Sequence, residues 1–245
     1  MKVLVFAAGL GTRLRPLTDR MPKALVPVGE KPLLAITLEH LVREGATEAV
    51  VNVHHFADQI KAYLQSHDFG IPVRVSDESD RLLDTGGGLR RALTLFQTDS
   101  DAPVLIHNVD ILSDAPLRQF YAQCSSAQAA LLVSDRASSR KLYFDVANRL
   151  CAWQNLNTGE VRGCADTSAL ASLTPYAFSG IHLFSPHLVA RMEPYGDCFP
   201  IMDFYLRECA TADIVGYPCQ GLRLIDVGKP ETLASAEEFL AAIRH

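Results

Sequence analysis

The first stretch able to do chemistry combines glycines, a hydroxyl and basic side chains near the start of the chain. Gly9 and Gly11 follow directly after an apolar run, and Thr12, Arg13 and Lys23 come next. Glycines let backbone N–H groups converge on oxygen atoms with no Cβ in the way, and basic side chains neutralise negative charge. The stretch therefore predicts a site for a phosphate chain, with a solvated turn carrying incidental arginines as the alternative.

Two familiar phosphate motifs do not fit this stretch. A Walker A loop needs GxxxxGK followed by Ser or Thr, whereas Lys23 follows Pro22. The dinucleotide fingerprint needs a third glycine where Leu14 stands, and Pro16 soon follows. The loop is therefore of another kind, in which a solvated arginine explains Arg15 as well as a ligand contact does.

Two aspartates stand at the ends of apolar segments far downstream. Asp110 ends VLIHNVD, and Asp226 lies in LRLIDVG before a glycine turn. Mg²⁺ prefers one or two carboxylates together with phosphate oxygens and water, so the two aspartates suit a metal-assisted phosphate reaction. For either aspartate alone, a helix N-cap or a turn is the alternative.

A run of three glycines, 86–88, leads into a helical pattern. Backbone without side chains can approach a flat ring closely, and unpaired N–H groups at a helix start can bind the edge of a nucleobase. A flexible helix start is the alternative.

The elements that must position these residues alternate between strand and helix in the first half. We expect strands at 2–8, 48–54, 71–77 and 102–110, and helices at 33–45, 56–66 and 87–96. This alternation is typical of right-handed βαβ crossovers and a mostly parallel sheet, which is an α/β fold with ligands at the carboxyl ends of the strands.

The second half has a looser pattern. We expect shorter, partly antiparallel strands at 129–135, 141–146, 149–155 and 176–184, followed by helices from 186 and at 201–209, strands at 213–218 and 222–228, and a last helix at 230–244. No repeat or linker divides the chain, so a single domain over 1–245 is predicted.

Composition limits the class of protein. The formal net charge of −5 argues against a general binder of nucleic acid or of membrane surfaces, because both reward a basic face. The six cysteines include no CxxC pair, and no segment has the length of a signal peptide or a membrane span. We expect a cytoplasmic protein with reduced thiols.

The stretch AAGLGTRLRPLTDRMPKALVPVGEKPLL resembles the signature of sugar-1-phosphate nucleotidyltransferases, GxGTRxRPLT followed by PK. The resemblance implies a three-layer Rossmann-like fold with a mostly parallel mixed sheet, and a loop that wraps a nucleoside triphosphate. It implies a nucleotide-binding half at about 1–114 and a sugar-binding half at 115–245. The implied nucleotide-binding residues of this stretch, of which the last two are also catalytic, are Ala8, Gly9, Gly11, Thr12, Arg13 and Lys23.

The same resemblance extends to the two aspartates. HNVD resembles the NGD motif of the family and DVGKP resembles its DxGTP motif, which implies that Asp110 and Asp226 bind Mg²⁺. Val109 replaces the middle glycine of NGD, and Lys229 replaces the threonine. Asn108 matches the asparagine that tends to touch the sugar in the family, although a turn former is the alternative.

Three further segments indicate which residues contact the base and the sugar. SDESDRLLDTGGG resembles the base-binding loop E…LGT(A/G)G, with Asp84 in place of a glycine, and FSGIHLF resembles the strand (N/S)xGIY. The usual EKP sugar motif is not visible, and AWQNLNTGE occupies the corresponding region, where a turn is the alternative to a sugar contact. The implied contacts are Glu78, Thr85, Gly86 and Gly87 for the base, and Asn155 and Gly180 for the sugar.

We therefore expect transfer of a nucleotidyl group from UTP to a sugar-1-phosphate. TGGG and the short chain most resemble the bacterial N-acetylmuramate-1-phosphate uridylyltransferases of peptidoglycan recycling. Guanylyl or thymidylyl transfer, phosphocholine cytidylyl transfer and a nucleotide-sensing regulatory subunit are the alternatives. No hexapeptide repeat follows, so no acetyltransferase domain is expected. The partners are small molecules, and the oligomeric state, a homo-oligomer included, is open.

Overall fold

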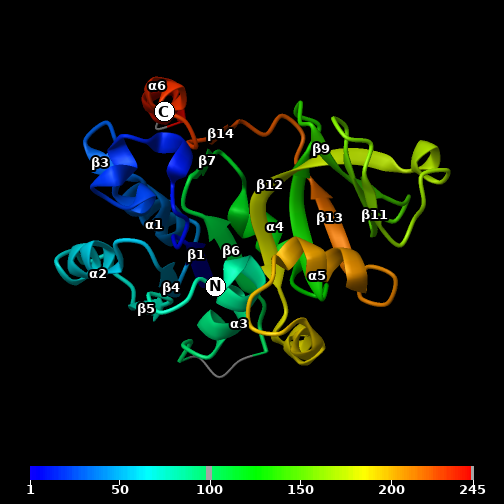
Figure 1. Ribbon diagram of the computed structural model, residues 1–245, viewed down its shortest axis with the longest axis horizontal. Coiled ribbons are helices and arrows are strands. Elements are labelled where there is room, and N and C mark those ends of the chain that lie inside the picture. Colours follow the sequence, from blue (N-terminus) through cyan, green and yellow to red (C-terminus); the bar gives the residue numbers. More distant parts are fainter. Residues whose placement is uncertain (98–100, 244–245) are drawn as a thin grey trace.

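The computed structural model describes residues 1–97 and 101–243, and a ten-stranded mixed sheet runs through them (Figure 1). The strand order is β5-β4-β1-β6-β12-β9-β10-β11, and β8 and β13 branch from β12. The strands of this sheet are β1 Lys2–Phe6, β4 Glu48–Val53, β5 Val73–Asp77, β6 Val104–Asn108, β8 Ala129–Ser134, β9 Arg140–Phe144, β10 Leu150–Asn155, β11 Val161–Gly163, β12 Thr174–Phe184 and β13 Ile214–Pro218.

The four strands β5, β4, β1 and β6 are parallel, as the alternation of strand and helix predicts. Their register is level at the carboxyl ends, where Phe6 lies opposite both Asn52 and Asn108. Ligands of open α/β sheets bind at this edge. The register therefore brings three side chains from distant parts of the sequence to one place.

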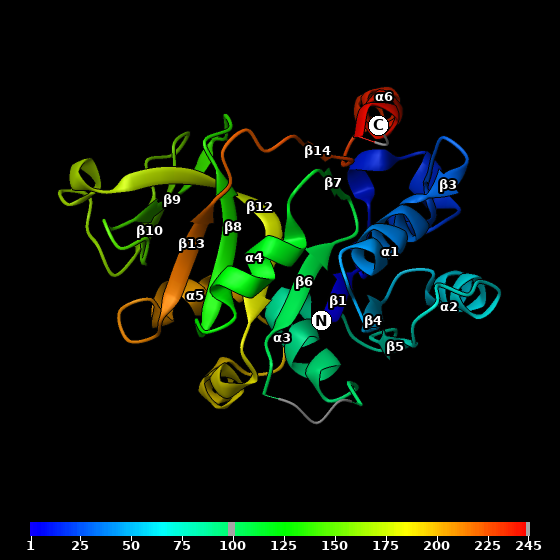
Figure 2. The same ribbon diagram turned by 180° about the vertical axis from the view of Figure 1, so that it is seen from behind.

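Helices cover both faces of the sheet because successive residues of a strand point to opposite sides. Val3 and Val5 belong to one core and Leu4 to the other. The first core is completed by α1 Leu33–Arg43, α2 Ala57–Gln65, α4 Leu117–Cys124 and α6 Glu231–Ile243, and the second by α3 Asp84–Leu93 and α5 Ile201–Glu208 (Figures 1 and 2). None of the described helices combines the length and the apolarity that crossing a membrane demands.

The two ends of strand β12 pair with different strands. Its first residues, 174–176, pair with β9, and its last residues, 181–184, pair with β6. The strands β9, β10 and β11 extend the sheet away from the parallel part (Figure 1). The helix expected from 186 is instead a run of 3₁₀ turns over Pro186–Tyr195, and Pro194, which has no N–H, lies near its end.

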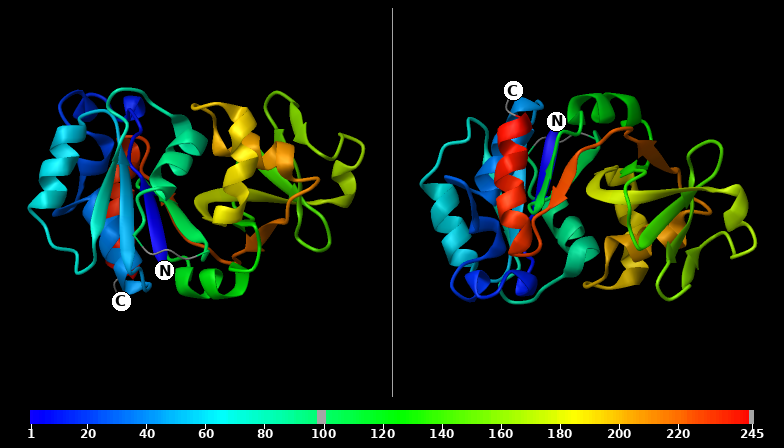
Figure 3. Two further views of the ribbon diagram at one scale, coloured as in Figure 1. Left: turned by 90° about the horizontal axis from the view of Figure 1, so that it is seen from below. Right: turned by 90° about the horizontal axis from the view of Figure 1, so that it is seen from above.

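The end of the chain returns to the first half of the molecule. Two small antiparallel pairs form outside the main sheet, β2 Pro27–Val28 with β3 Lys31–Pro32, and β7 Ile111–Ser113 with β14 Leu224–Asp226. After β14, α6 packs beside the N-terminal elements, where Glu237 accepts a hydrogen bond of 3.0 Å from the Gly29 N–H (Figure 3). The helix expected at 230–244 matches α6, and Arg244 lies outside the described residues.

Candidate active site

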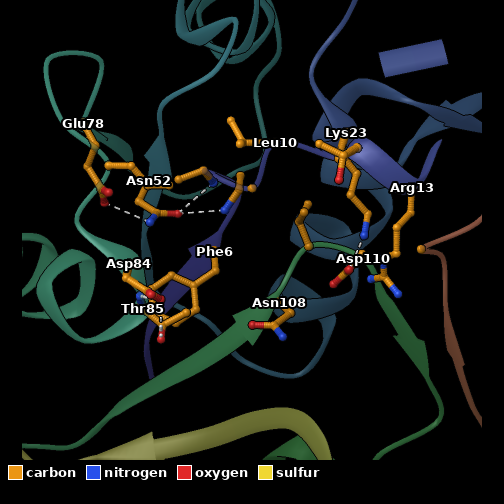
Figure 4. A pocket seen from close by; sticks show the side chains of 18 residues that line it. Phe6, Leu10, Arg13, Lys23, Asn52, Glu78, Asp84, Thr85, Asn108 and Asp110 are labelled. Carbon is orange, nitrogen blue, oxygen red and sulfur yellow. Dashed lines mark hydrogen bonds and ion pairs between the residues drawn. The ribbon is translucent and has the colours of Figure 1, made fainter. Parts of the chain in front are cut away.

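A cavity of about 470 Å³ opens at the carboxyl ends of β1, β4 and β6 (Figure 4). Ten of the residues implied by the family resemblance line it, together with eight others. The ten are Ala8, Gly9, Gly11, Thr12, Arg13, Lys23, Glu78, Thr85, Asn108 and Asp110.

The loop after β1 is closed by a glycine that no other residue can replace without strain. Gly11 has φ +64°, and a Cβ there would lie 2.9 Å from Thr18 Cγ2 and 3.0 Å from Lys23 Cβ. The Thr18 hydroxyl donates to the Gly11 carbonyl at 2.8 Å. The loop is therefore held against the segment that carries Lys23. Arg15 instead forms an exposed ion pair with Asp19, at 3.2 Å, and does not line the cavity.

An ion pair lies in the cavity wall. Lys23 Nζ contacts Asp110 Oδ2, and the side chains are only 10% and 19% exposed. Lys23 begins a 3₁₀ turn and Asp110 follows β6, so the contact joins two distant segments. Removing one partner would leave a poorly solvated charge unpaired, which is costly. Figure 4 shows Arg13 beside this pair.

Asp226 is brought next to Asp110 by backbone pairing. Asp226 lies opposite Ile111 in the β7–β14 pair, and the Val227 N–H donates to the Asp110 carbonyl at 2.8 Å. Gly228 lines the cavity, and a Cβ there would lie 2.7 Å from Asp226 Oδ1 and 2.8 Å from Arg13 Nη2. The carboxylate and the guanidinium therefore flank one glycine at the cavity edge.

The Mg²⁺ ion expected from the sequence takes oxygen ligands, which the carboxylates of Asp110 and Asp226 could supply. Among residues 1–97 and 101–243, no three His, Cys, Asp or Glu side chains are grouped closely enough to hold a metal alone. Mg²⁺ at phosphate-transfer sites does not need such a cage, because one or two carboxylates suffice when phosphate oxygens and water supply the remaining ligands. The Val227 hydrogen bond holds the backbones of Asp110 and Asp226 together, and the role of their carboxylates as Mg²⁺ ligands stays a prediction.

Glu78 forms the opposite end of the cavity and is fully buried. Its Oε1 accepts a 2.9 Å hydrogen bond from Asn52 Nδ2, and its Oε2 accepts a 3.1 Å bond from the Leu83 N–H. Burial raises the pKa of the Glu78 carboxyl, while these hydrogen bonds oppose the rise. The side chain is therefore a fixed acceptor at the wall of the cavity.

Thr85 lines the cavity at the start of α3, but Gly86 and Gly87 do not. A Cβ on Gly86 would lie 2.2 Å from the Phe199 ring, and a Cβ on Gly87 would lie 1.9 Å from the Asp197 carbonyl oxygen. The two glycines therefore face the segment before α5, and their absent side chains let that segment rest directly on α3.

The predicted sugar residues are not gathered in one place. Asn108 lines the cavity, and Gly180, with φ +79°, lies behind it, since a Cβ there would be 2.9 Å from Asn108 Nδ2. Asn155 ends β10 in a tight turn, where its Oδ1 accepts from the Asn157 N–H at 3.0 Å. Asn155 does not line the cavity, and its contacts are those of the turn that the sequence offers as an alternative.

Asn52 is the main cavity residue that the sequence did not single out. Its Oδ1 accepts hydrogen bonds from the N–H groups of Ala7 and Ala8, at 2.7 and 3.3 Å, and its Nδ2 donates to Glu78. The available signal was a polar residue inside the apolar run VVNV. Phe6 and Leu82 also line the cavity. His54 and His55, which follow β4 in the chain, do not line it.

Known proteins similar to this chain share one family. The model described as "Nucleotidyl transferase" matches residues 2–242. The chain is 32% identical over 245 residues to the N-acetylmuramate alpha-1-phosphate uridylyltransferase of Caulobacter vibrioides, covering 97% of this chain and 96% of the relative. It is 30% identical over 244 residues to the mannose-1-phosphate guanyltransferase of Debaryomyces hansenii, covering 96% of this chain and 63% of the relative.

Solved structures share the fold. HddC from Yersinia pseudotuberculosis superposes with a TM-score of 0.77 at 21% identity, covering 98% of this chain and 99% of that one. The inositol-1-phosphate CTP transferase of T. maritima gives 0.77 at 14% identity, covering 100% and 96%. The Rossmann-like fold with a mixed central sheet, expected from the sequence, is confirmed.

Proposed function

Because the chain belongs to the nucleotidyl transferase family, we propose that it transfers a uridylyl group from UTP to N-acetylmuramate-1-phosphate, giving a UDP-sugar and pyrophosphate. The observation that carries the reaction is the cavity in which a glycine loop, Arg13 and the Lys23–Asp110 pair meet next to Asp226. The choice of base and sugar is supported by the Caulobacter relative, which matches along nearly the whole of both chains.

The reaction needs positioning and charge neutralisation more than proton transfer. The phosphate oxygen of the sugar-1-phosphate is already a nucleophile; it attacks the α-phosphorus, and pyrophosphate leaves with the electron pair of the broken P–O bond. The N–H groups of the loop, between Ala8 and Thr12, hold phosphate oxygens in line for this attack. Arg13 and Lys23 stabilise the negative charge that shifts onto the leaving group.

Asp110 and Asp226 would hold Mg²⁺, which when bound draws charge from the phosphates of the nucleotide. We place the base of the nucleotide at the end of the cavity where Glu78 lies, away from Lys23 and Asp110 (Figure 4). A carboxylate accepts hydrogen bonds from the ring N–H of uracil, and Asn108, which lines the cavity, is the expected contact to the sugar.

Guanylyl transfer is the second candidate. Mannose-1-phosphate guanyltransferases, such as that of Gibberella zeae, are 36% identical to this chain over 124 residues, which cover 50% of this chain and 34% of the relative. A carboxylate at Glu78 also suits guanine, which presents two neighbouring N–H donors. The base is therefore the property to measure first.

The test is a screen for pyrophosphate release that crosses UTP, GTP, CTP and dTTP with sugar-1-phosphates. The panel includes N-acetylmuramate-, N-acetylglucosamine-, glucose- and mannose-1-phosphate, with phosphocholine as a further acceptor. We expect the highest kcat/KM for UTP with N-acetylmuramate-1-phosphate. A higher value for GTP with mannose-1-phosphate would replace the proposal with the second candidate. Tight nucleotide binding by calorimetry without release from any pair would indicate a regulatory subunit.

A further inference from the structure

The Asn52 side chain links the start of the glycine loop to the Glu78 carboxylate. It lies near the end of β4 with only 3% of its surface exposed. Toward the phosphate side, its Oδ1 accepts from the N–H groups of Ala7 and Ala8, and toward the base side, its Nδ2 donates to Glu78 Oε1 at 2.9 Å (Figure 4). One amide therefore spans the start of the glycine loop and the buried carboxylate.

Few side chains have the hydrogen-bonding groups that position 52 requires. The side chain must accept on one side and donate on the other, and an amide does both. Aspartate would set a second carboxylate against Glu78, and an apolar side chain would leave two N–H groups and a carboxylate without a partner in a buried place, which is costly.

Helix α3 lies close against the side chains of Asn52 and Glu78 and restricts their movement. A Cβ on Gly88 would lie 2.8 Å from Glu78 Oε1 and 3.1 Å from Asn52 Nδ2. The third glycine of the run thus lets α3 lie directly against the hydrogen bond between Asn52 and Glu78. Besides Asn52, the Leu83 N–H donates to the Glu78 carboxylate at 3.1 Å.

We propose that Asn52 is a positioning residue. It fixes the position of the Glu78 carboxylate relative to the phosphate loop, so that the base and the triphosphate of one nucleotide bind at the same time. The inference rests on the proposed function in that Glu78 faces the base. Asn52 itself does not touch reacting atoms; it acts through Glu78 and through the backbone at Ala7 and Ala8.

The expected signature is a loss of nucleotide selectivity. In Asn52→Ala and Asn52→Asp, kcat/KM for the preferred nucleotide falls roughly ten- to a hundredfold, the cost of a buried hydrogen bond to a charged group. The loss lies mostly in the KM for the nucleotide, and the preference among UTP, GTP, CTP and dTTP becomes flatter. Asn148→Asp, which adds the same charge at an exposed turn, leaves kcat and KM unchanged.

The decisive variant exchanges the two partners. In Asn52→Asp with Glu78→Gln, the carboxylate at 52 still accepts from Ala7 and Ala8, the amide at 78 donates to it, and the amide oxygen at 78 accepts from the Leu83 N–H. Net charge is unchanged. Such a pair should regain the melting temperature that Asn52→Asp loses, as expected for coupled neighbours in a double-mutant cycle, while the nucleotide preference stays flattened because the Glu78 carboxylate that accepts from the base has been replaced.

Two results would overturn the inference. One is an unchanged nucleotide preference and KM in Asn52→Ala. The other is an exchanged variant whose melting temperature stays at that of Asn52→Asp, since the side chains at 52 and 78 would then not be coupled. If wild-type protein releases no pyrophosphate from any pair, the proposed function fails, and calorimetric titration of the same variants with the four nucleotides still tests whether Asn52 sets their relative affinity.

Discussion

Replacing Gly87 by alanine tests whether the glycine run serves packing. Gly87 lies inside α3, where Gly→Ala ordinarily stabilises a helix by about 1 kcal/mol. Here the new Cβ would lie 1.9 Å from the Asp197 carbonyl oxygen and 3.1 Å from Leu83 Cβ. Backbone cannot rotate away as a side chain can, so α3 and the segment before α5 must separate.

The loss of stability in Gly87→Ala depends on how firmly α3 and the segment before α5 are held together. The Gly86 N–H donates to the Phe199 carbonyl at 2.8 Å, and Arg90 pairs with Asp197 at 2.9 Å, so the segment is anchored on both sides of the clash. Overpacking of this kind costs about 1–3 kcal/mol, and a backbone clash belongs at the upper end. After the helix gain is subtracted, we expect a net loss of about 2 kcal/mol, or about 4–8 °C in melting temperature for a chain of this size.

The assay is thermal unfolding followed by circular dichroism, with Gly9→Ala as the matched control. Gly9 has no atom within 4 Å of its built Cβ, so alanine there should leave the melting temperature unchanged. A Gly87→Ala protein that melts with the wild type would refute the reasoning. It would mean that the segment before α5 does not rest on α3, and that the glycines are open to a ligand.

Three further predictions concern the cavity and the pH response. Lys23→Ala and Asp110→Ala should each lower the rate of pyrophosphate release by about 100-fold or more, with the circular dichroism spectrum retained. The control Lys31→Ala, which breaks the exposed Lys31–Glu39 pair, should leave the rate unchanged. Near wild-type turnover in either cavity variant would contradict the mechanism. Chelation by EDTA should stop turnover and added Mg²⁺ should restore it, with more Mg²⁺ needed in Asp226→Ala; turnover that persists in EDTA contradicts the metal role. Burial lowers the pKa of His107 to about 4 and of His182 to about 3, so below about pH 6.5 the unfolded chain binds protons that the folded chain does not bind. The melting temperature should therefore fall as the pH is lowered from about 6.5 to 4. A melting temperature that does not change over this range would contradict the prediction.

Sequence patterns predicted the parts of the site that are local. Gly11, Thr12 and Lys23 lie in one continuous stretch, so their types and spacing indicate a phosphate loop without knowledge of the fold. The strand and helix alternation predicted the parallel half because periodicity reflects burial directly. Asp110 and Asp226 needed the family resemblance, since a strand-end aspartate alone suits a turn equally well.

The remaining features depend on tertiary contacts that no local pattern encodes. Asn52 becomes significant only when the register of β1 and β4 sets it beside Ala7 and Glu78. Gly86 and Gly87 look open to a ring in the sequence because glycine serves both ligand approach and helix packing, and only the position of Phe199 and Asp197 separates the two. The base-binding role of these two glycines stays a prediction.

The pairing of β14 with β7 has a consequence for how the enzyme comes into being. The parallel strands, the glycine loop and Lys23 precede β14 in the chain, so Asp226 reaches Asp110 only after β14 has been synthesised. A nascent chain halted before β14 could fold its sheet while lacking one of its two carboxylates. On the predicted metal role of Asp226, a product truncated before β14 would bind a nucleotide without completing the reaction centre.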